Sequence, residues 1–213
     1  MNEILERRFA PARGLRVVRA EGDSRRIVGY AAVFDTLSVE LWGFREMVAP
    51  GAFAETLEDD VRALWNHSEL MVLGRTKSGT LALREDEVGL WTETDPPASA
   101  GALLETIERG DVDQMSFGFR TLKDTWRVDE NEMLIRTLLK VKLYDISPVT
   151  FPAYPATSVG VRSAEEFRAI YGQLPEIPAD LRARIAGNSR NGDEQARARV
   201  LWRRRALMLS EIE

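Results

Sequence analysis

The chain has 213 residues, of which 44% are apolar and 30% charged, a composition typical of soluble globular proteins. It contains no cysteine and a single histidine, His67, which excludes disulfides, thiolate metal sites, cysteine nucleophiles and sites built from several histidines. The net charge of −5 argues against nucleic acid as the main partner, because nucleic-acid binding is dominated by basic side chains.

Strand-like runs dominate the chain from Leu15 to about Arg162. A hairpin-type turn signal, Glu21 to Ser24, separates the first two runs, and Pro50-Gly51 marks a turn that we expect to lead into a short helix. In the first half of the chain the expected strands are 15–20, 27–34, 68–75, 80–85 and 89–94, and the expected helix is 52–57.

The dipeptide Pro96-Pro97 then interrupts the pattern. Ser99 is the expected N-cap of a helix over 100–109, and Gly110 occupies the position where a left-handed residue ends a helix. Four further strands are expected, over 114–122, 125–128, 133–143 and 145–151. Beyond them the sequence favours helices, over 164–171, 179–186 and 194–209.

These elements predict a mainly β body with one or two helices packed on it, followed by a helical tail. We expect two parts: residues 1–162 as the functional domain and 163–213 as the helical tail. The charged residues among the first 20 positions interrupt any secretory signal, so we do not expect secretion. No apolar run approaches the roughly 20 residues of a membrane helix.

His67 is the first residue that could carry chemistry. An imidazole is the usual group that takes a proton from a serine hydroxyl near neutral pH. A lone histidine is more often a surface or hydrogen-bonded structural residue, and the sequence leaves both interpretations open.

The segment 114–119 supplies a candidate hydroxyl. Strand alternation places Ser116, Gly118 and Arg120 on one face and three apolar side chains, those of Met115, Phe117 and Phe119, on the other. A glycine beside the serine would leave room for a substrate backbone to approach. The plain alternative is an ordinary serine on an edge strand.

Asp145 follows a strongly apolar run, so its carboxylate must be hydrogen-bonded or paired. Orienting a catalytic histidine is one way to satisfy it, and a structural salt bridge is another. Ser147 lies on the same strand face and is a competing hydroxyl. The scattered acids have no metal-ligand spacing and there is no phosphate-binding loop, so we expect neither a metal nor a cofactor.

Taken together, these segments resemble the prohead proteases of tailed bacteriophages, which mature capsids. The similarity runs over roughly residues 29–156, and its motifs lie at 29–35, 43–46, 50–53, 66–67, 73–76, 89–90, 115–119 and 145–153. No single motif decides the match, but their order and spacing are specific.

The resemblance implies a serine endopeptidase whose histidine, serine and acid map onto His67, Ser116 and Asp145. The family more often has Glu at the third position, and Glu46 is the alternative acid. Oxyanion-hole candidates are the backbone N–H groups near Phe117 and Gly118 and the side chains of Arg75 and Arg120. The implied fold is a closed or partly open β-barrel surrounded by helices, similar to herpesvirus assemblin.

The implied partners are the major capsid protein with its scaffolding segment and the protease itself, by autocleavage and as a homodimer. The implied location is the inside of the prohead in the host cytoplasm, without a membrane or nucleic-acid partner. We expect the tail to target the enzyme to the prohead and to be removed by self-cleavage. The competing interpretation is a non-catalytic, protease-like internal scaffold.

Overall fold

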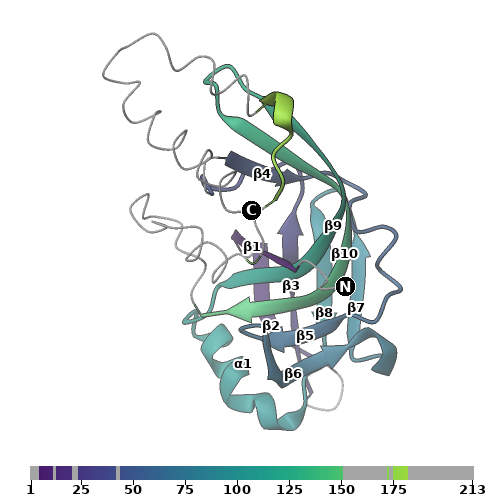
Figure 1. Ribbon diagram of the computed structural model, residues 1–213. Coiled ribbons are helices and arrows are strands. Elements are labelled where there is room, and N and C mark those ends of the chain that lie inside the picture. The colour runs from purple at the N-terminus through teal and green to yellow at the C-terminus, as the bar shows by residue number, and fades with distance from the viewer. Residues whose placement is uncertain are drawn as a thin grey trace.

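Two long antiparallel strands, β9 (Gln114–Val128) and β10 (Leu134–Val149), run through the middle of the molecule (Figure 1). The computed structural model describes residues 5–11, 13–20, 24–41, 44–150, 172 and 175–181. Each long strand was predicted as two shorter ones. The pairing instead continues through register shifts near Lys140 and between Leu143 and Asp145, because a bulge absorbs an irregular residue without ending the strand.

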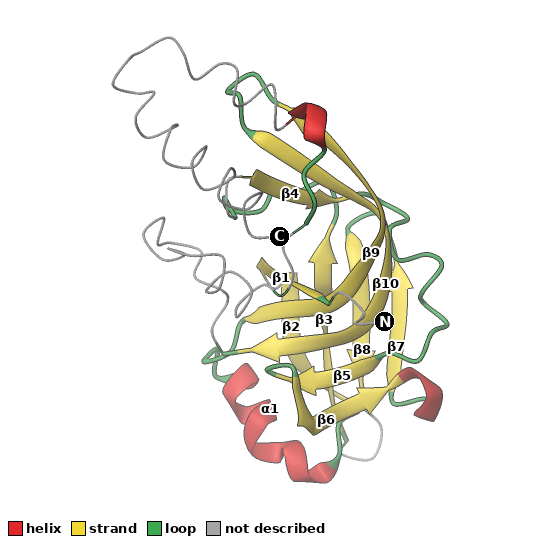
Figure 2. Ribbon diagram, viewed as in Figure 1, coloured by secondary structure: helices red, strands yellow, loops and turns green. Residues whose placement is uncertain are grey.

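The described strands form two sheets. The larger has the order β1-β9-β10-β5-β6, with β4 also paired to β10, and the smaller has the order β2-β3-β8-β7. In Figure 2 the strands of one sheet cross those of the other. The remaining bounds are β1 (Glu6–Pro11), β2 (Arg13–Arg19), β3 (Arg25–Val33), β4 (Phe44–Val48), β5 (Arg62–Trp65), β6 (Ser68–Arg75), β7 (Leu81–Glu85) and β8 (Gly89–Thr94).

The prediction of a mainly β body is confirmed. Of the two predicted forms, a closed or a partly open barrel, the closed one is wrong. A barrel requires the two edges of a sheet to pair, whereas among the described strands the larger sheet ends at β1 and β6 and the smaller at β2 and β7. The sheets instead bury a shared core, to which β3 contributes Ala31 and β9 contributes Phe117. Met115 and Phe119 lie in the same core, which confirms the predicted apolar face of residues 114–119.

Helices do not surround the described part of the molecule. It contains α1 (Gly101–Glu108) and the short 3₁₀ helices η2 (Thr76–Ser78) and η3 (Ala98–Ala100). The helix predicted over 100–109 is confirmed by α1. Gly110, which follows its last turn, has the expected left-handed φ of 79°. The predicted cap at Ser99 is wrong, because that residue lies inside η3 and the N-cap position, Ala100, makes no side-chain cap bond.

The predicted helix over 52–57 is also wrong. This segment is a series of turns in which Ala52 N–H bonds to Ala49 O at 3.2 Å and Thr56 N–H to Phe53 O at 2.9 Å. Two of its other backbone groups bond to neighbouring elements: Phe53 N–H donates to Glu85 Oε1 at 2.8 Å and Ala52 O accepts from Val141 N–H at 3.0 Å. These tertiary bonds replace the i to i−4 bonds of a helix.

Strands β1, β4 and β5 were not predicted, because they are short and carry charged residues rather than a clear apolar alternation. The predicted tail helices lie outside the described residues, except that residues 179–181 are helical. The division at residue 162 stays a prediction. Within the described residues, no helix combines the length and apolar character needed to cross a bilayer.

Candidate active site

His67 is presented by a tight hairpin turn between β5 and β6. Trp65 pairs with Ser68, so Asn66 and His67 form a two-residue loop, and both have positive φ, 52° and 55°. Two positive φ angles characterise the turn type that fits the twist of a hairpin, and Asn and His tolerate this region better than most residues. The turn thus sets the direction of the imidazole.

The hairpin turn is attached to the end of β10. Asn66 N–H donates to Pro148 O at 3.0 Å, and the Asn66 side chain exchanges two hydrogen bonds with Thr150, at 3.0 and 2.8 Å. The sequence interpretation assigned no role to this pair. Asparagine at the first position of a two-residue turn was the available signal.

Asp145 contacts the imidazole from β10. Its Oδ2 atom lies 2.5 Å from His67 Nδ1, and the two side chains are 10% and 6% exposed, respectively. Because an ionised carboxylate can only accept hydrogen bonds, Nδ1 is the donor and carries a proton. In the neutral ring the other nitrogen, Nε2, is therefore an acceptor.

Ser116 meets this second nitrogen. Its Oγ atom lies 2.5 Å from His67 Nε2, so the hydroxyl can donate to the imidazole that Asp145 orients. The structure thus brings the three predicted side chains into one chain of hydrogen bonds, from β9, the β5–β6 turn and β10. Strand pairing brings Ser116 and Asp145 near the same imidazole. Ser116 on β9 lies opposite Ser147 on β10, and Ser147 is two residues after Asp145.

Ser147, the competing hydroxyl, lies on the other side of the imidazole. Its Oγ accepts a hydrogen bond from His67 N–H at 3.2 Å and is 3.4 Å from both His67 Nδ1 and Asp145 Oδ2. It therefore faces the protonated nitrogen rather than the acceptor nitrogen. This position suits a residue that supports the histidine and not one that gives it a proton.

Gly118 has a different role from the predicted one. It lies opposite Asp145 in the ladder, and a β-carbon added there would lie under 3.0 Å from Asp145 Oδ1. The space beside the serine is therefore filled by the carboxylate of Asp145, not left open for a substrate backbone. The glycine allows the acid to reach the histidine.

The oxyanion-hole candidates are placed unequally. Phe117 and Gly118 lie inside β9, between β1 and β10. The Arg75 guanidinium is held by Asp60 through two bonds of 2.6 Å. These hydrogen bonds lower the pKa of Asp60 to about 2 and raise that of Arg75. Arg120 lies four residues after Ser116 on β9. Which of these four groups donates to the oxyanion stays a prediction.

Glu46, the alternative acid, belongs to a separate buried cluster. Its carboxylate accepts from Arg8 Nε at 2.7 Å and from Arg136 Nη1 at 2.9 Å. Asp145 is the acid that contacts His67, and Glu46 is occupied by these two guanidinium groups.

Residues 14–170 match the family described as Caudovirus prohead serine protease. The solved structure of the bacteriophage T4 capsid assembly protease is similar at 12% identity with a TM-score of 0.44, covering 71% of this chain and 100% of that one. Comparison with curated proteins gives no significant match. Since the family match spans more than half of the chain, the protein belongs to the Caudovirus prohead serine protease family.

Proposed function

We propose that this protein is a serine endopeptidase in which Ser116 is the nucleophile, His67 its general base and Asp145 the residue that orients the imidazole. The observation that carries the proposal is the unbroken chain of contacts from Ser116 Oγ to His67 Nε2 and from His67 Nδ1 to Asp145 Oδ2, both 2.5 Å. Membership of a serine protease family supports it.

Acylation begins when Ser116 Oγ forms a bond to the carbonyl carbon of the scissile peptide and its proton passes to His67 Nε2. The imidazolium, stabilised by Asp145, then gives this proton to the leaving nitrogen as the carbon–nitrogen bond breaks. In the second half of the reaction, water gives a proton to His67 Nε2 and bonds to the acyl carbon. The bond from this carbon to Ser116 Oγ then breaks, and the imidazolium returns the proton to the serine oxygen.

The tetrahedral intermediate also requires donors to its oxygen anion. Backbone N–H groups near Phe117 and Gly118, or the guanidinium of Arg75 or Arg120, are the candidates. Loss of one such donor typically lowers the rate by about 10²–10³.

The proposed substrates are the scaffolding segment of the major capsid protein and the protease itself, inside the prohead. The family description supports a role in capsid assembly. The proposed function of residues 163–213, targeting followed by self-removal, rests on their expected helical, arginine-rich character.

The direct test is co-expression of the capsid protein with Ser116→Ala or His67→Ala. Either substitution should abolish cleavage of the scaffolding segment, because each removes one partner of the proton transfer. Cleavage at the wild-type rate by Ser116→Ala would remove this serine from the mechanism. A wild-type protein that cleaves neither capsid protein nor itself would instead favour the internal-scaffold interpretation.

A further inference from the structure

Strand β10 contains an irregular residue directly before the proposed catalytic acid. Leu143 and Ile146 both lie in the core, although regular alternation places residues two apart, and not three apart, on one face of a strand. In the ladder with β9, Leu143 and Asp145 lie opposite consecutive residues of β9. Tyr144, which lies between them, is therefore an extra residue on β10 and forms a β-bulge.

This bulge decides which way Asp145 points. Without the extra residue, alternation would place Asp145 on the same face as Leu143, inside the core, and Ile146 on the opposite face. With the bulge, Asp145 lies on the outer face of the sheet, where its Oδ2 atom is 2.5 Å from His67 Nδ1. The contact between the acid and the histidine therefore depends on the position of the bulge.

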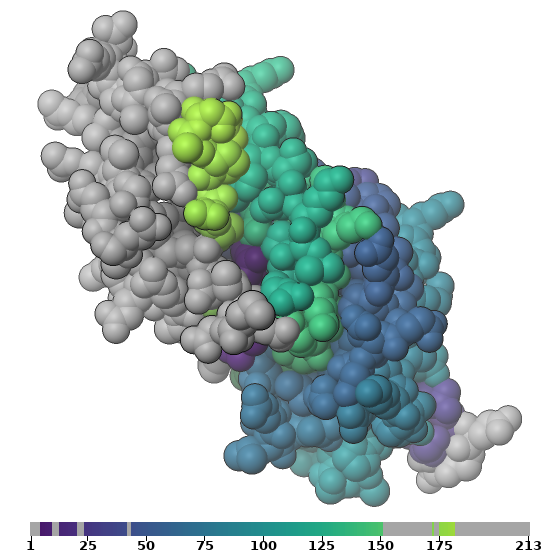
Figure 3. Space-filling view, turned by 45° about the vertical axis from the view of Figure 1, so that its right-hand side comes forward, coloured from purple at the N-terminus to yellow at the C-terminus, as the bar shows by residue number. Residues whose placement is uncertain are grey.

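Along one edge, β10 is attached first to β4, then to the turns that follow β4, and last to β5. Strand β4 pairs with β10 as far as Leu138, and β5 pairs with Asp145 and the residue after it. Between these strands, Ala49 N–H donates to Leu138 O and Val141 N–H donates to Ala52 O, both at 3.0 Å. In Figure 3 the blue surface of this part of the chain lies directly against the green surface of β10.

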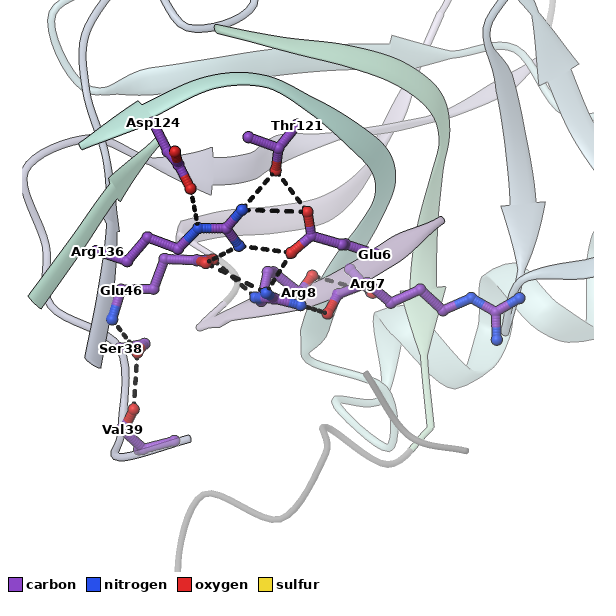
Figure 4. Close-up of polar contacts among 10 residues, drawn as sticks. Glu6, Arg7, Arg8, Ser38, Val39, Glu46, Thr121, Asp124 and Arg136 are labelled. Atoms are coloured by element: carbon purple, nitrogen blue, oxygen red, sulfur yellow. Dashed lines mark hydrogen bonds and ion pairs between the residues drawn. The ribbon is translucent and has the colours of Figure 1, made fainter. Parts of the chain in front are cut away.

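The first half of β10 is also held by Arg136, which is 2% exposed. Its guanidinium donates to Asp124 on β9 at 2.6 Å, to Glu6 on β1 at 2.5 Å and to Glu46 on β4 at 2.9 Å (Figure 4). Sliding this half of the strand by one residue would turn Arg136 to the other face and break all three contacts. A change at the bulge therefore moves Asp145 rather than the first half of β10.

One side chain bonds to β10 immediately before the bulge. Leu143 N–H donates to Thr56 Oγ1 at 3.0 Å, and Thr56 is 2% exposed. The Thr56 hydroxyl gives its own proton to Asp59 Oδ2 at 3.0 Å, which leaves its lone pairs to accept from Leu143. The bonds from Ala49 and Ala52 use backbone atoms, whereas this bond depends on the type of side chain at position 56.

We propose, on the basis of the serine protease function above, that Thr56 is a positioning residue of the active site. Its hydroxyl fixes Leu143 so that the extra residue stays at Tyr144 and Asp145 faces His67. Loss of the hydroxyl leaves the Leu143 N–H as a buried donor without this acceptor, a state that folded proteins avoid. The strand then shifts at the bulge, and the contact between Asp145 and His67 weakens.

The first test follows the proton between His67 Nδ1 and Asp145 by nuclear magnetic resonance of the full chain. Because His67 is the only histidine, its imidazole signals can be assigned without ambiguity. A proton held in a short bond between an imidazole nitrogen and a carboxylate resonates at unusually low field. Thr56→Val, which replaces the hydroxyl by a methyl group, should move this signal upfield or abolish it. An unchanged signal in folded Thr56→Val would overturn the proposal.

Two further variants separate positioning from general loss of stability. Thr56→Ser keeps the hydroxyl and should rescue the low-field signal. Thr92, which is 1% exposed, donates to Gly29 O at 3.0 Å in the smaller sheet. Thr92→Val therefore removes a comparably buried hydroxyl, and it should lower thermal stability but leave the signal unchanged. Loss of the signal in Thr56→Ser or in Thr92→Val would also overturn the proposal.

The second test measures cleavage of capsid protein by the same variants. Thr56→Val should lower kcat about tenfold or more, less than the roughly 10⁴-fold loss typical of disabling the orienting acid. It should leave KM unchanged, because it alters the direction of the acid and not the binding of the peptide. Thr56→Ser should restore kcat. A raised KM with unchanged kcat would contradict the positioning role.

If Thr56→Val does not fold, Thr56→Cys takes its place in both tests. A thiol is a weaker acceptor than a hydroxyl, so smaller changes in the same direction are expected. A wild-type signal together with a wild-type kcat in Thr56→Cys would overturn the proposal.

The two tests also separate failure of this proposal from failure of the proposed function. Cleavage that persists in Ser116→Ala would overturn the function, whereas the His67 signal requires no substrate. A His67 signal that ignores Thr56→Val would overturn only the positioning role of Thr56.

Discussion

Gly118 and Asp145 lie opposite each other in the β9–β10 ladder, and a β-carbon at Gly118 would be under 3.0 Å from the Asp145 carboxylate. We therefore expect Gly118→Ala to push the carboxylate away from His67 and to lower kcat by up to about 10⁴, the loss typical of disabling the orienting acid. Cleavage of capsid protein by the purified variant measures this effect.

Gly101→Ala is the matched control. Its new β-carbon would meet only the end of the flexible Arg25 side chain, at 3.3 Å, and its φ of −51° is one that alanine readily adopts. Activity should be unchanged. Full activity of Gly118→Ala would show that Asp145 need not approach the histidine.

Asp145→Asn should lower kcat by about 10⁴ without unfolding the protein. An amide can donate as well as accept, so it no longer forces the proton onto His67 Nδ1, and Nε2 loses its role as acceptor. Circular dichroism checks that the variant is folded, and single-turnover cleavage measures the rate of the chemical step. A loss below tenfold would point to another acid.

Ser147→Ala should reduce activity only about tenfold. Its hydroxyl supports the His67 backbone at 3.2 Å, a bond worth about 1 kcal/mol, and faces the protonated ring nitrogen. Mass spectrometry after reaction with a serine-reactive fluorophosphonate should therefore find the label on Ser116 and not on Ser147. Label on Ser147 would reverse the assignment of the nucleophile.

Asn66→Gly tests whether the attachment of the turn to β10 matters. Glycine keeps the positive φ of 52° at this position but removes both bonds to Thr150. We expect kcat to fall about tenfold or more with little change in thermal stability, since only the orientation of the His67 turn is loosened. Thr150→Val removes the hydroxyl that accepts from Asn66 Nδ2 but keeps the backbone N–H that donates to Asn66 Oδ1, so it should have a smaller effect in the same direction.

Stability at acid pH should depend on Asp60. Its pKa of about 2, against an ordinary value of 3.8, is set first by the hydrogen bond from Arg75. A depressed carboxylate pKa stabilises the fold fully above the ordinary value, and this contribution is lost as the pH falls from about 4 to about 2. Denaturant unfolding of Asp60→Asn should therefore show a shallower loss over this range than the wild type.

The sequence determined those features that depend on local pattern and composition. Alternation identified the apolar, core-facing side of residues 114–119, helix periodicity identified α1, and the solitary histidine limited imidazole chemistry to one position. Each depends on neighbouring residues or on a count, so no knowledge of the fold was required.

The tertiary structure decided what depends on strand register. It placed Asp145 in the space left by Gly118 and attached the His67 turn to β10. It also brought Glu6, Arg8, Glu46 and Arg136 together from three strands. Charged residues at distant positions give no periodic signal, because their partners are fixed only when the strands pair.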